Sequence, residues 1–420
     1  MAWMDKLHHP RRYITAFLKW CVLGFLMGAM GGLVGSGFHY ALHFVTHLRS
    51  EHTWLIFLLP VGGLLTVGIY KLFKQENNRG TNEIIDAVLQ GERVNPLIAP
   101  VIFLATGITH LFGGSAGREG AALQIGGSVA SSIGKLLKLD DQDRTVLIMS
   151  GMSAVFAGLF GTPLTAYLFV VEFISVGSIF TPALLPCYLA AYVASRGSAV
   201  LGVHAETHLL ETAAVVDAHN ILAYLVLAIA VAVLGMVMCQ VFHKAEHLAK
   251  HHLPNPWVRI CAGGVVIAAM TLIVGDHRFN GAGMDMALEA VAGNADWYSF
   301  LVKMLFTAVT LAAGFKGGEI VPTFCIGATF GCVFGELLGL DSGISAALGL
   351  VGLFCSVTNA PLASIMLSIE MFGGANVHLF ALVCVFCFVL SGHSGLYASQ
   401  VHLFDKGSSS RAPREQQHHG

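Results

Sequence analysis

The residues with the clearest chemical potential are a charged pair set among glycines. Residues 113–120 read GGSAGREG, and apolar sequence flanks them on both sides. An ionisable side chain at membrane depth is costly and is therefore usually functional. Glu119, the carboxylate of this segment, is accordingly the first candidate for a functional residue.

The glycines are expected to open a helix, because apolar residues of good helix propensity run from Ala121 to about Leu137. A helix amino end leaves N–H groups without acceptors and carries the positive end of the helix dipole, and together these form an anion site. A phosphate-binding loop is excluded because no Gly-Lys-Ser/Thr follows.

A carboxylate inside an anion site can act as a gate. An ionised, flexible Glu119 can occupy the position of the anion, whereas a protonated one can leave it, so the same side chain can carry a proton. This favours the exchange of anions for protons. The alternative is that the glycines only permit close helix packing and that Glu119 pairs with Arg118.

The composition places these residues in a membrane. Hydrophobic residues make up 55% of the 420 residues and charged ones 11%, and the mean hydropathy is +0.70. Long apolar runs with charge confined to short breaks favour a helical bundle over a barrel. A net charge of -2 without a basic domain gives no footprint for nucleic acid.

The amino-terminal apolar run follows Lys6, Arg11 and Arg12 and shows no convincing cleavage site. We interpret it as a retained first helix with its amino end in the cytoplasm. The absence of an N-x-S/T sequon favours a bacterial inner (plasma) membrane. The nine scattered cysteines are expected to be buried free thiols.

One further motif could bind a metal. Residues 243–247 read HKAEH, which fits the H-x-x-E-H pattern of a zinc protease. The motif ends an apolar run and adjoins Lys250, His251 and His252, so a solvated helix face is the favoured interpretation. We expect no metal site and no cofactor.

The chain contains an internal repeat. The paired landmarks are Gly80 and Gly283 (offset 203), 117–119 and 317–319 (offset 200), and Pro163 and Pro361 (offset 198), with Glu172 and Glu370 each nine residues after its proline. Several landmarks in one order at nearly one offset indicate a duplication. The repeat supplies Glu319 as a counterpart of Glu119, which close packing alone does not require.

Duplicated halves with glycine-interrupted or proline-interrupted apolar segments are typical of secondary transporters and related channels, whose site lies at the repeat interface. The predicted fold is therefore an all-α integral membrane protein with two inverted-topology repeats and broken, re-entrant helices. The expected division is a cytoplasmic segment 1–12, a first repeat 13–203, a linker 204–220, a second repeat 221–404 and a disordered tail 405–420.

The second half repeats the anion-binding device. Residues 317–322 read GGEIVP and precede an expected helix of about Thr323 to Leu338, with Pro322 suited to a first turn. Two helix amino ends, one from each half, can then meet around one anion. A third candidate is the loop of Gly80, Thr81 and Asn82, whose hydroxyl and amide can donate hydrogen bonds.

These motifs resemble those of the CLC family of chloride channels and anion/proton antiporters. Residues 117–120 followed by Gln124 resemble its gating-glutamate signature, residues 317–322 its second anion-coordinating loop, and residues 395–397 the segment of its pore tyrosine. The resemblance implies a homodimer of inverted-repeat protomers with one pore per subunit. It names a halide, protons and membrane lipid as partners.

The resemblance also implies residue roles. Glu119 is the gate, the N–H groups of Gly120, Ile320 and Val321 face the anion, and Tyr397 donates its hydroxyl to the central site. The expected anion-binding residues are Gly80, Thr81, Asn82, Arg118, Gly120, Glu319, Ile320, Val321 and Tyr397.

Three departures from the family bear on the ion. Residues 78–82 read NRGTN in place of the usual Gly-Ser-Gly-Ile-Pro, Phe173 stands where chloride exchangers carry the internal proton-transfer glutamate, and Glu319 replaces an apolar residue. Together they resemble the fluoride/proton antiporter branch. Fluoride is therefore favoured over chloride, and a passive chloride channel or a chloride/proton exchanger is the alternative.

Overall fold

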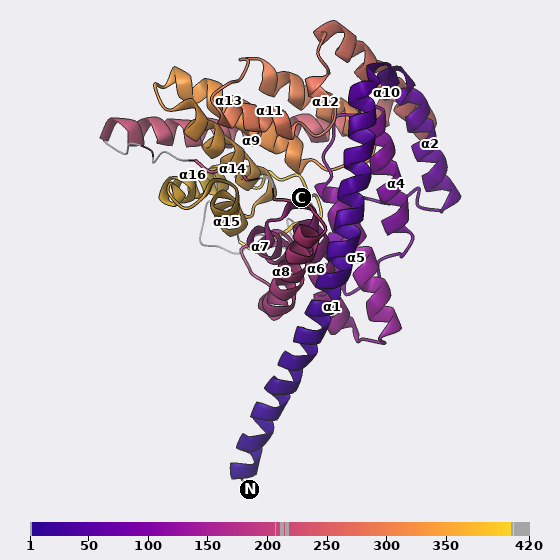
Figure 1. Cartoon of the computed structure of the whole chain (residues 1–420), viewed down its shortest axis with the longest axis vertical. Coiled ribbons are helices and arrows are strands. Elements are labelled where there is room, and N and C mark those ends of the chain that lie inside the picture. Colours follow the sequence, from indigo (N-terminus) through magenta and orange to yellow (C-terminus); the bar gives the residue numbers. More distant parts are fainter. Residues whose placement is uncertain (1, 206, 211–213, 215–217, 405, 407–420) are drawn as a thin grey trace.

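A computed structural model shows an almost entirely α-helical molecule (Figure 1). The first half contains α1 (Ala2–Glu51), α2 (Leu59–Leu72), α3 (Thr81–Gln90), α4 (Ile98–Leu111), α5 (Glu119–Leu136), α6 (Asp141–Phe160), α7 (Pro163–Phe173) and α8 (Leu184–Val200). The second half contains α9 (Ala218–His252), α10 (Pro256–Val274), α11 (Met284–Val291), α12 (Ser299–Ala313), α13 (Ile320–Leu337), α14 (Ser342–Thr358), α15 (Pro361–Phe372) and α16 (Val377–Leu390). Short 3₁₀ helices are η1 (Thr53–Leu58), η2 (Thr181–Ala183) and η3 (His277–Phe279).

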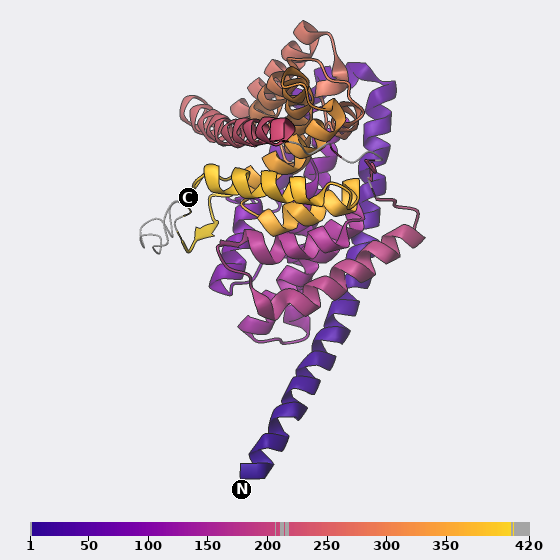
Figure 2. The same ribbon diagram turned by 90° about the vertical axis from the view of Figure 1, so that its left-hand side faces the viewer.

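The structure describes residues 2–205, 207–210, 214, 218–404 and 406. The predicted tail, apart from residue 406, and parts of the predicted linker lie outside these residues. Helix α1 begins at Ala2 and continues across the predicted boundary at residue 13. It crosses the flank of the molecule as one long tilted rod whose amino end projects beyond the other helices (Figure 2).

Equivalent helices of the two halves begin with the same residue types in the same capping or first-turn positions, which confirms the repeat. Helices α7 and α15 both begin at a proline, a residue that fits the first helical turn because its missing N–H is not needed there. Helices α6 and α14 both follow an aspartate N-cap. The carboxylate of Asp140 accepts from the N–H of Asp143 at 2.8 Å, and that of Asp341 accepts from the N–H of Ile344 at 2.8 Å.

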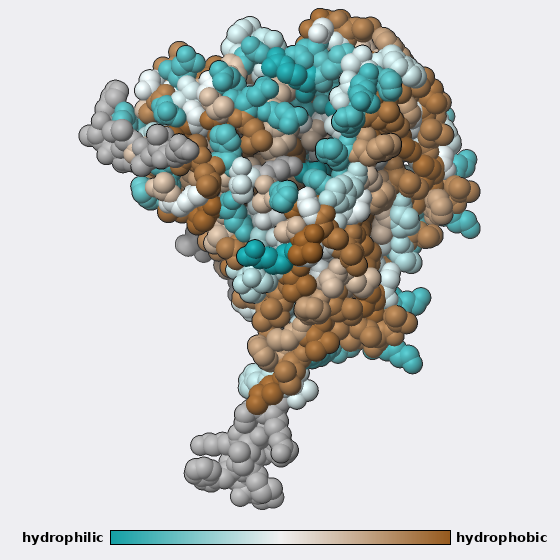
Figure 3. All heavy atoms as spheres, in the orientation of Figure 1, coloured by the Kyte–Doolittle hydropathy of each residue, from teal (hydrophilic) through white to brown (hydrophobic). Residues whose placement is uncertain are grey.

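Helix lengths match the expected broken architecture. Six helices in the described part of the chain are long and apolar enough to cross a membrane, and six further apolar helices have only 10–17 residues. At about 1.5 Å per residue, such short helices do not cross a hydrocarbon core of about 30 Å. Apolar side chains cover the flank formed by α1 and α2, as expected for a lipid-facing surface (Figure 3).

Glycines allow the central helices of each half to pack closely. A Cβ on Gly126 of α5 would lie 2.2 Å from the carbonyl oxygen of Gly151 in α6, and one on Gly327 of α13 would lie 2.5 Å from that of Gly349 in α14. Small residues at helix contacts are typical of membrane bundles. These contacts fix how α5 and α13 enter the centre of the molecule.

The carboxy-terminal segment returns to the first half. Strand β2 (Val401–His402) pairs in parallel with β1 (Ser175–Val176), directly after α7. The amide of Gln400 donates to the carbonyl oxygens of Phe173 at 2.5 Å and Thr358 at 2.7 Å. The segment that carries Tyr397 is thereby held between α7 and α14.

Candidate functional site

The two glycine segments meet at the centre of the molecule. The N–H of Gly117 donates to the carbonyl oxygen of Gly318 at 2.7 Å, and the N–H of Gly318 donates to that of Gly117 at 2.8 Å. This antiparallel bridge joins the segment before α5 to the segment before α13. As predicted, two helix amino ends, one from each half, come together.

Glu119 lies at this junction. It is the first residue of α5, and its side chain is fully buried. A Cβ on Gly117 would lie 2.2 Å from its Oε2, and a Cβ on Gly318 would lie 2.3 Å from the same atom. The carboxylate is therefore folded back over both bridge glycines, in front of the helix amino end.

The carboxylate is surrounded by backbone N–H groups. Those of Glu119 itself, Arg118 and Val321 approach it, although neither oxygen has a hydrogen-bond partner of ordinary geometry within the described part of the chain. N–H groups at a helix amino end favour negative charge, whether it belongs to a carboxylate or to a free anion. The Glu119 oxygens thus occupy the place where an anion would be stabilised.

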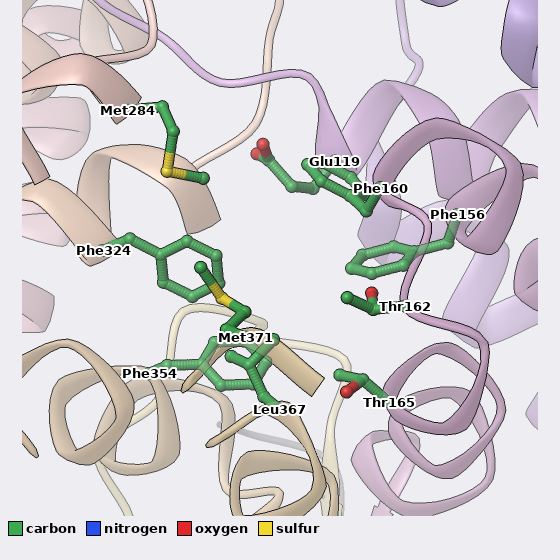
Figure 4. A pocket seen from close by; sticks show the side chains of 10 residues that line it. All are labelled: Glu119, Phe156, Phe160, Thr162, Thr165, Met284, Phe324, Phe354, Leu367 and Met371. Carbon is green, nitrogen blue, oxygen red and sulfur yellow. The ribbon is translucent and has the colours of Figure 1, made fainter. Parts of the chain in front are cut away.

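A small cavity opens beside Glu119 between the two halves. Its volume is about 20 Å³, which is enough for roughly one water-sized particle. The lining residues are Glu119, Phe156, Phe160, Thr162, Thr165, Met284, Phe324, Phe354, Leu367 and Met371. In Figure 4 the Glu119 side chain extends along the upper edge of the cavity, and its oxygens point toward the side of Met284.

Tyr397 and Glu319 lie within reach of this carboxylate. The Tyr397 hydroxyl is buried, has no hydrogen-bond partner among the described residues, and is subject to the charges of both Glu319 and Glu119. Its ring packs edge-on against Phe173, with centroids 5.4 Å apart. The two glutamates of the repeat and the tyrosine therefore lie within electrostatic reach of one another, with Glu119 and Tyr397 buried and Glu319 half-buried.

The predicted first anion loop is helical at two of its three positions. Gly80 adopts a φ of +66° and ends the loop, whereas Thr81 and Asn82 form the first turn of α3. The Thr81 hydroxyl oxygen lies 3.1 Å from where a Cβ on Gly120 would stand, so it borders the amino end of α5. Asn82 instead accepts from the N–H of Ser399 at 3.0 Å and so positions the Tyr397 segment.

The remaining predicted residues border the junction. Ile320 and Val321 begin α13, and Gly120 is the second residue of α5, so their N–H groups belong to first helical turns, which lack acceptors within the helix. The Arg118 guanidinium lies over the ring of Phe160 at 5.0 Å.

The structure contains a reciprocal pair of helix caps that the sequence analysis did not predict. Glu172, at the end of α7, accepts from the N–H groups of Leu362 at 3.0 Å and Ala363 at 2.8 Å, at the start of α15. Glu370, at the end of α15, accepts from the N–H groups of Leu164 at 2.9 Å and Thr165 at 2.7 Å, at the start of α7. The signal was present, since both glutamates recur nine residues after a proline.

Lys303 was also missed. Its side chain is fully buried in α12, and its ammonium group donates to Ser115 Oγ at 3.0 Å and to the carbonyl oxygens of Phe279 at 3.1 Å and Gly281 at 2.7 Å. It thereby ties the first glycine segment to the loop before α11. A single charge inside the apolar run 299–313 was the signal that could have identified it.

The H-x-x-E-H motif lies on the exposed end of α9. Glu246 pairs with Lys250 at 2.6 Å, and His243 and His247 face outward. Among the residues that the structure describes, no three His, Cys, Asp or Glu side chains converge on a position for a metal ion.

Comparisons with known proteins agree with this geometry. A family profile described as "Voltage gated chloride channel" matches residues 62–391. The chain is 33% identical over 406 residues to a "Chloride/fluoride channel protein" of Pseudomonas syringae pv. tomato, covering 94% of this chain and 90% of that protein. It is 25% identical over 387 residues to an "H(+)/Cl(-) exchange transporter ClcA" of Vibrio campbellii, covering 82% and 80% of the two chains.

Solved structures give the same result. A crystal structure of a CLC-type fluoride/proton antiporter superposes with a TM-score of 0.88 at 31% identity, covering 92% of this chain and 98% of that one. A slow cyanobacterial Cl-/H+ antiporter superposes with a TM-score of 0.75 at 21% identity, covering 89% and 94%, which bears on the fold alone. With its profile match over most of its length and a relative more than 30% identical, the chain belongs to the CLC family of voltage-gated chloride channels and anion/proton antiporters.

Proposed function

We propose that this protein exchanges a halide for protons across a membrane, and that fluoride rather than chloride is its substrate. The observation that carries the proposal is the position of the Glu119 carboxylate, which is folded over Gly117 and Gly318 in front of two helix amino ends. There the ionised side chain competes with an anion for the same N–H groups. Protonation removes its charge, releases it from that position and admits the anion.

Glu319 and Tyr397 extend the site toward the rest of the pore. Both lie within electrostatic reach of Glu119, so the charge on each group depends on a proton or an anion held at the others. The Tyr397 hydroxyl has no acceptor among the described residues, which leaves its donor for the anion. A protonated Glu319 is a second donor of this kind.

Fluoride is favoured by the size of the site and by the donors proposed around Glu119. It is small and strongly hydrated, so a binding site must replace its water with strong hydrogen-bond donors, and the cavity of about 20 Å³ beside Glu119 suits a small particle. The relatives described as a chloride/fluoride channel protein and as a fluoride/proton antiporter support the same choice.

A passive anion channel is the second candidate, because Phe173 stands at the position expected for an internal proton-transfer glutamate. The neighbouring Glu172 does not substitute for it in this structure, since both of its carboxylate oxygens accept backbone N–H groups of α15. In the proposed exchanger, protons reach Glu119 by way of Glu319 instead.

We further propose a homodimer in a bacterial inner membrane, with one pore per subunit and with the amino terminus of α1 in the cytoplasm. The excess of Lys and Arg before the first apolar run supports this orientation. Residues 13–203 and 221–404 then form the two repeats of each protomer.

Reconstitution into liposomes tests the function. Liposomes that contain the purified protein are loaded with fluoride or with chloride, and anion efflux and external pH are recorded together. We expect fluoride efflux to exceed chloride efflux and to be accompanied by proton uptake. Equal or faster chloride efflux would overturn the choice of ion, and anion efflux without proton movement would identify the channel.

A further inference from the structure

A second, larger cavity lies directly outside the gate. This cavity, which we call the vestibule, has a volume of about 640 Å³. Met284 lines both the vestibule and the small cavity beside Glu119, and Val321, whose N–H approaches the Glu119 carboxylate, also lines the vestibule. At about 30 Å³ per water molecule, the vestibule has room for a hydrated anion immediately before the gate.

Helix α1 supplies a row of imidazoles to the vestibule wall. His39, His43 and His47 all line it, and their spacing of four residues places them on one face of the helix. The rings of His39 and His43 are stacked, with centroids 6.3 Å apart. None of these residues belongs to the motifs that identify the gate.

Two arginines give the vestibule wall a permanent positive charge. Arg49 and Arg118 line the vestibule, and the Arg49 guanidinium donates to the carbonyl oxygen of His110 at 3.1 Å. Lys303 lies directly behind Gly283, which lines the vestibule, because a Cβ on Gly283 would be 2.8 Å from the Cε of Lys303. The ammonium group of Lys303 donates to three neutral oxygens, and within the described residues no carboxylate forms an ion pair with it.

A further arginine at the vestibule is already paired with carboxylates. Arg278 lies between Asp276 at 2.6 Å, Asp296 at 3.0 Å and Glu289 at 3.7 Å. Burial alone would raise the pKa of the Asp276 carboxyl, but the backbone N–H and the guanidinium of Arg278 hold that pKa below its usual value.

Asp285, His277 and His110 also line the vestibule. Asp285 acts on Arg49, and a ring nitrogen of His110 lies 3.3 Å from the carbonyl oxygen of Gly117. Glu51 does not line the vestibule but lies 3.7 Å from His47. Of all these groups, the histidines are the ones whose charge ordinarily changes between about pH 8 and 5.

We propose that the vestibule is an anion-capture site for small monovalent anions, in which Arg49 and Arg118 hold the anion and the row His39, His43 and His47 adjusts the local charge with pH. Positive charge at a confined, low-dielectric mouth concentrates anions and speeds their association. At low pH on this side, the protonated row raises anion occupancy before the gate. This site rests on the function proposed above, since it supplies the anion to the same gate.

A cysteine placed in the row tests the charge directly. His43→Cys is made, and the purified protein in liposomes is treated with a methanethiosulfonate that carries either a trimethylammonium or a sulfonate group. At an anion concentration below saturation, we expect the cationic reagent to raise the initial anion flux about threefold relative to the anionic one, and the difference to vanish at saturation. If both reagents change the flux alike, or neither changes it, the site is refuted.

Two controls accompany this measurement. The unsubstituted protein reports reaction at its own cysteines, of which only Cys21 and Cys261 are not buried. His243→Cys places the same reagents on the exposed end of α9, away from the residues that line the vestibule, so the difference between the two reagents should be smaller there.

A pH series gives an independent readout. We expect the apparent KM of the native protein for the anion to fall several-fold between about pH 7.5 and 5.5. In the variant with His39, His43 and His47 all changed to Asn, this fall should become smaller, and the part that remains is due to protonation of Glu119. An unaltered pH dependence of KM would contradict the site. Because anion flux is measured, the result stands whether or not protons are coupled, and it is separate from a failure of the proposed exchange.

Discussion

Gly318 of the second repeat lies against the carboxylate of Glu119 from the first. A Cβ at Gly318 would come within 2.3 Å of Glu119 Oε2 and within 2.8 Å of the N–H nitrogens of Glu119 and Gly120. The position of the Glu119 carboxylate, the proposed gate, is therefore set by a contact between halves, at a residue where no side chain fits. Several expectations depend on this contact and on its neighbours.

Gly318→Ala should impair transport. The added methyl group must displace either the Glu119 carboxylate or the backbone bridge to Gly117, and overpacking of this kind costs about 1–3 kcal/mol. We expect anion flux to fall about tenfold, which corresponds to about 1.4 kcal/mol. The measurement is initial flux in liposomes at matched protein amounts.

Gly107→Ala is the matched control for that substitution. A Cβ at Gly107, in α4, meets no atom within 4 Å, so flux and thermal stability should be unchanged or slightly improved. Native flux in Gly318→Ala would show that the gate does not depend on the space at Gly318.

Tyr397→Phe should separate binding from stability. The hydroxyl has no hydrogen-bond partner among the described residues, so its removal should leave the melting temperature in detergent unchanged. If it donates to the anion, the loss of about 0.5–1.5 kcal/mol should raise the apparent KM about two- to twelvefold. A lower melting temperature with unchanged KM would assign the hydroxyl a structural role.

Asn82 and Tyr397 should be energetically coupled. Asn82 accepts from the N–H of Ser399 and so holds the segment that carries the tyrosine. Asn82→Ala removes this hydrogen bond and should let the segment of Tyr397 shift, which lowers the affinity for the anion. The effect of Asn82→Ala should be smaller when Tyr397 is already replaced by Phe. The measurement is a double-mutant cycle on apparent KM. Strictly additive effects would show that the two residues act independently.

Glu172 should act as a helix cap and not as a proton carrier. Glu172→Ala should lower the free energy of unfolding by about 1–3 kcal/mol, because the N–H groups of Leu362 and Ala363 lose their acceptors. Glu172→Gln retains one acceptor oxygen and should keep the native ratio of protons to anions. Loss of proton coupling in the Gln variant, with anion flux preserved, would assign Glu172 to the proton route.

Glu370→Ala is the corresponding change in the other half. It removes the acceptor of the N–H groups of Leu164 and Thr165, and it should destabilise the protein to a similar extent. Thermal unfolding in one detergent compares the two variants directly.

Much of the architecture could be predicted from the sequence, because the repeat contains several residues that can be recognised locally. The prolines that begin α7 and α15 and the glycines before α5 and α13 act within a few residues of their own positions, so a linear comparison finds them. The helix expected from about Ala121 begins two residues earlier, at Glu119. That shift places Glu119 itself in the first turn.

The remaining features depend on contacts between distant segments. Nothing local to Asn82 indicates that it binds Ser399, and nothing local to Lys303 identifies Ser115 and Gly281 as its acceptors. The vestibule likewise combines a face of α1 with η3 and α11, which are more than 200 residues away along the chain. Such relationships arise only when the two halves pack together.

Proton movement against a gradient tests the central claim most directly. Liposomes with the native protein or with Glu119→Gln are given a fluoride gradient and an opposing pH gradient, and internal pH is followed. The native protein should drive protons uphill, and the variant should pass fluoride without moving protons. Uphill proton movement by Glu119→Gln would contradict the account.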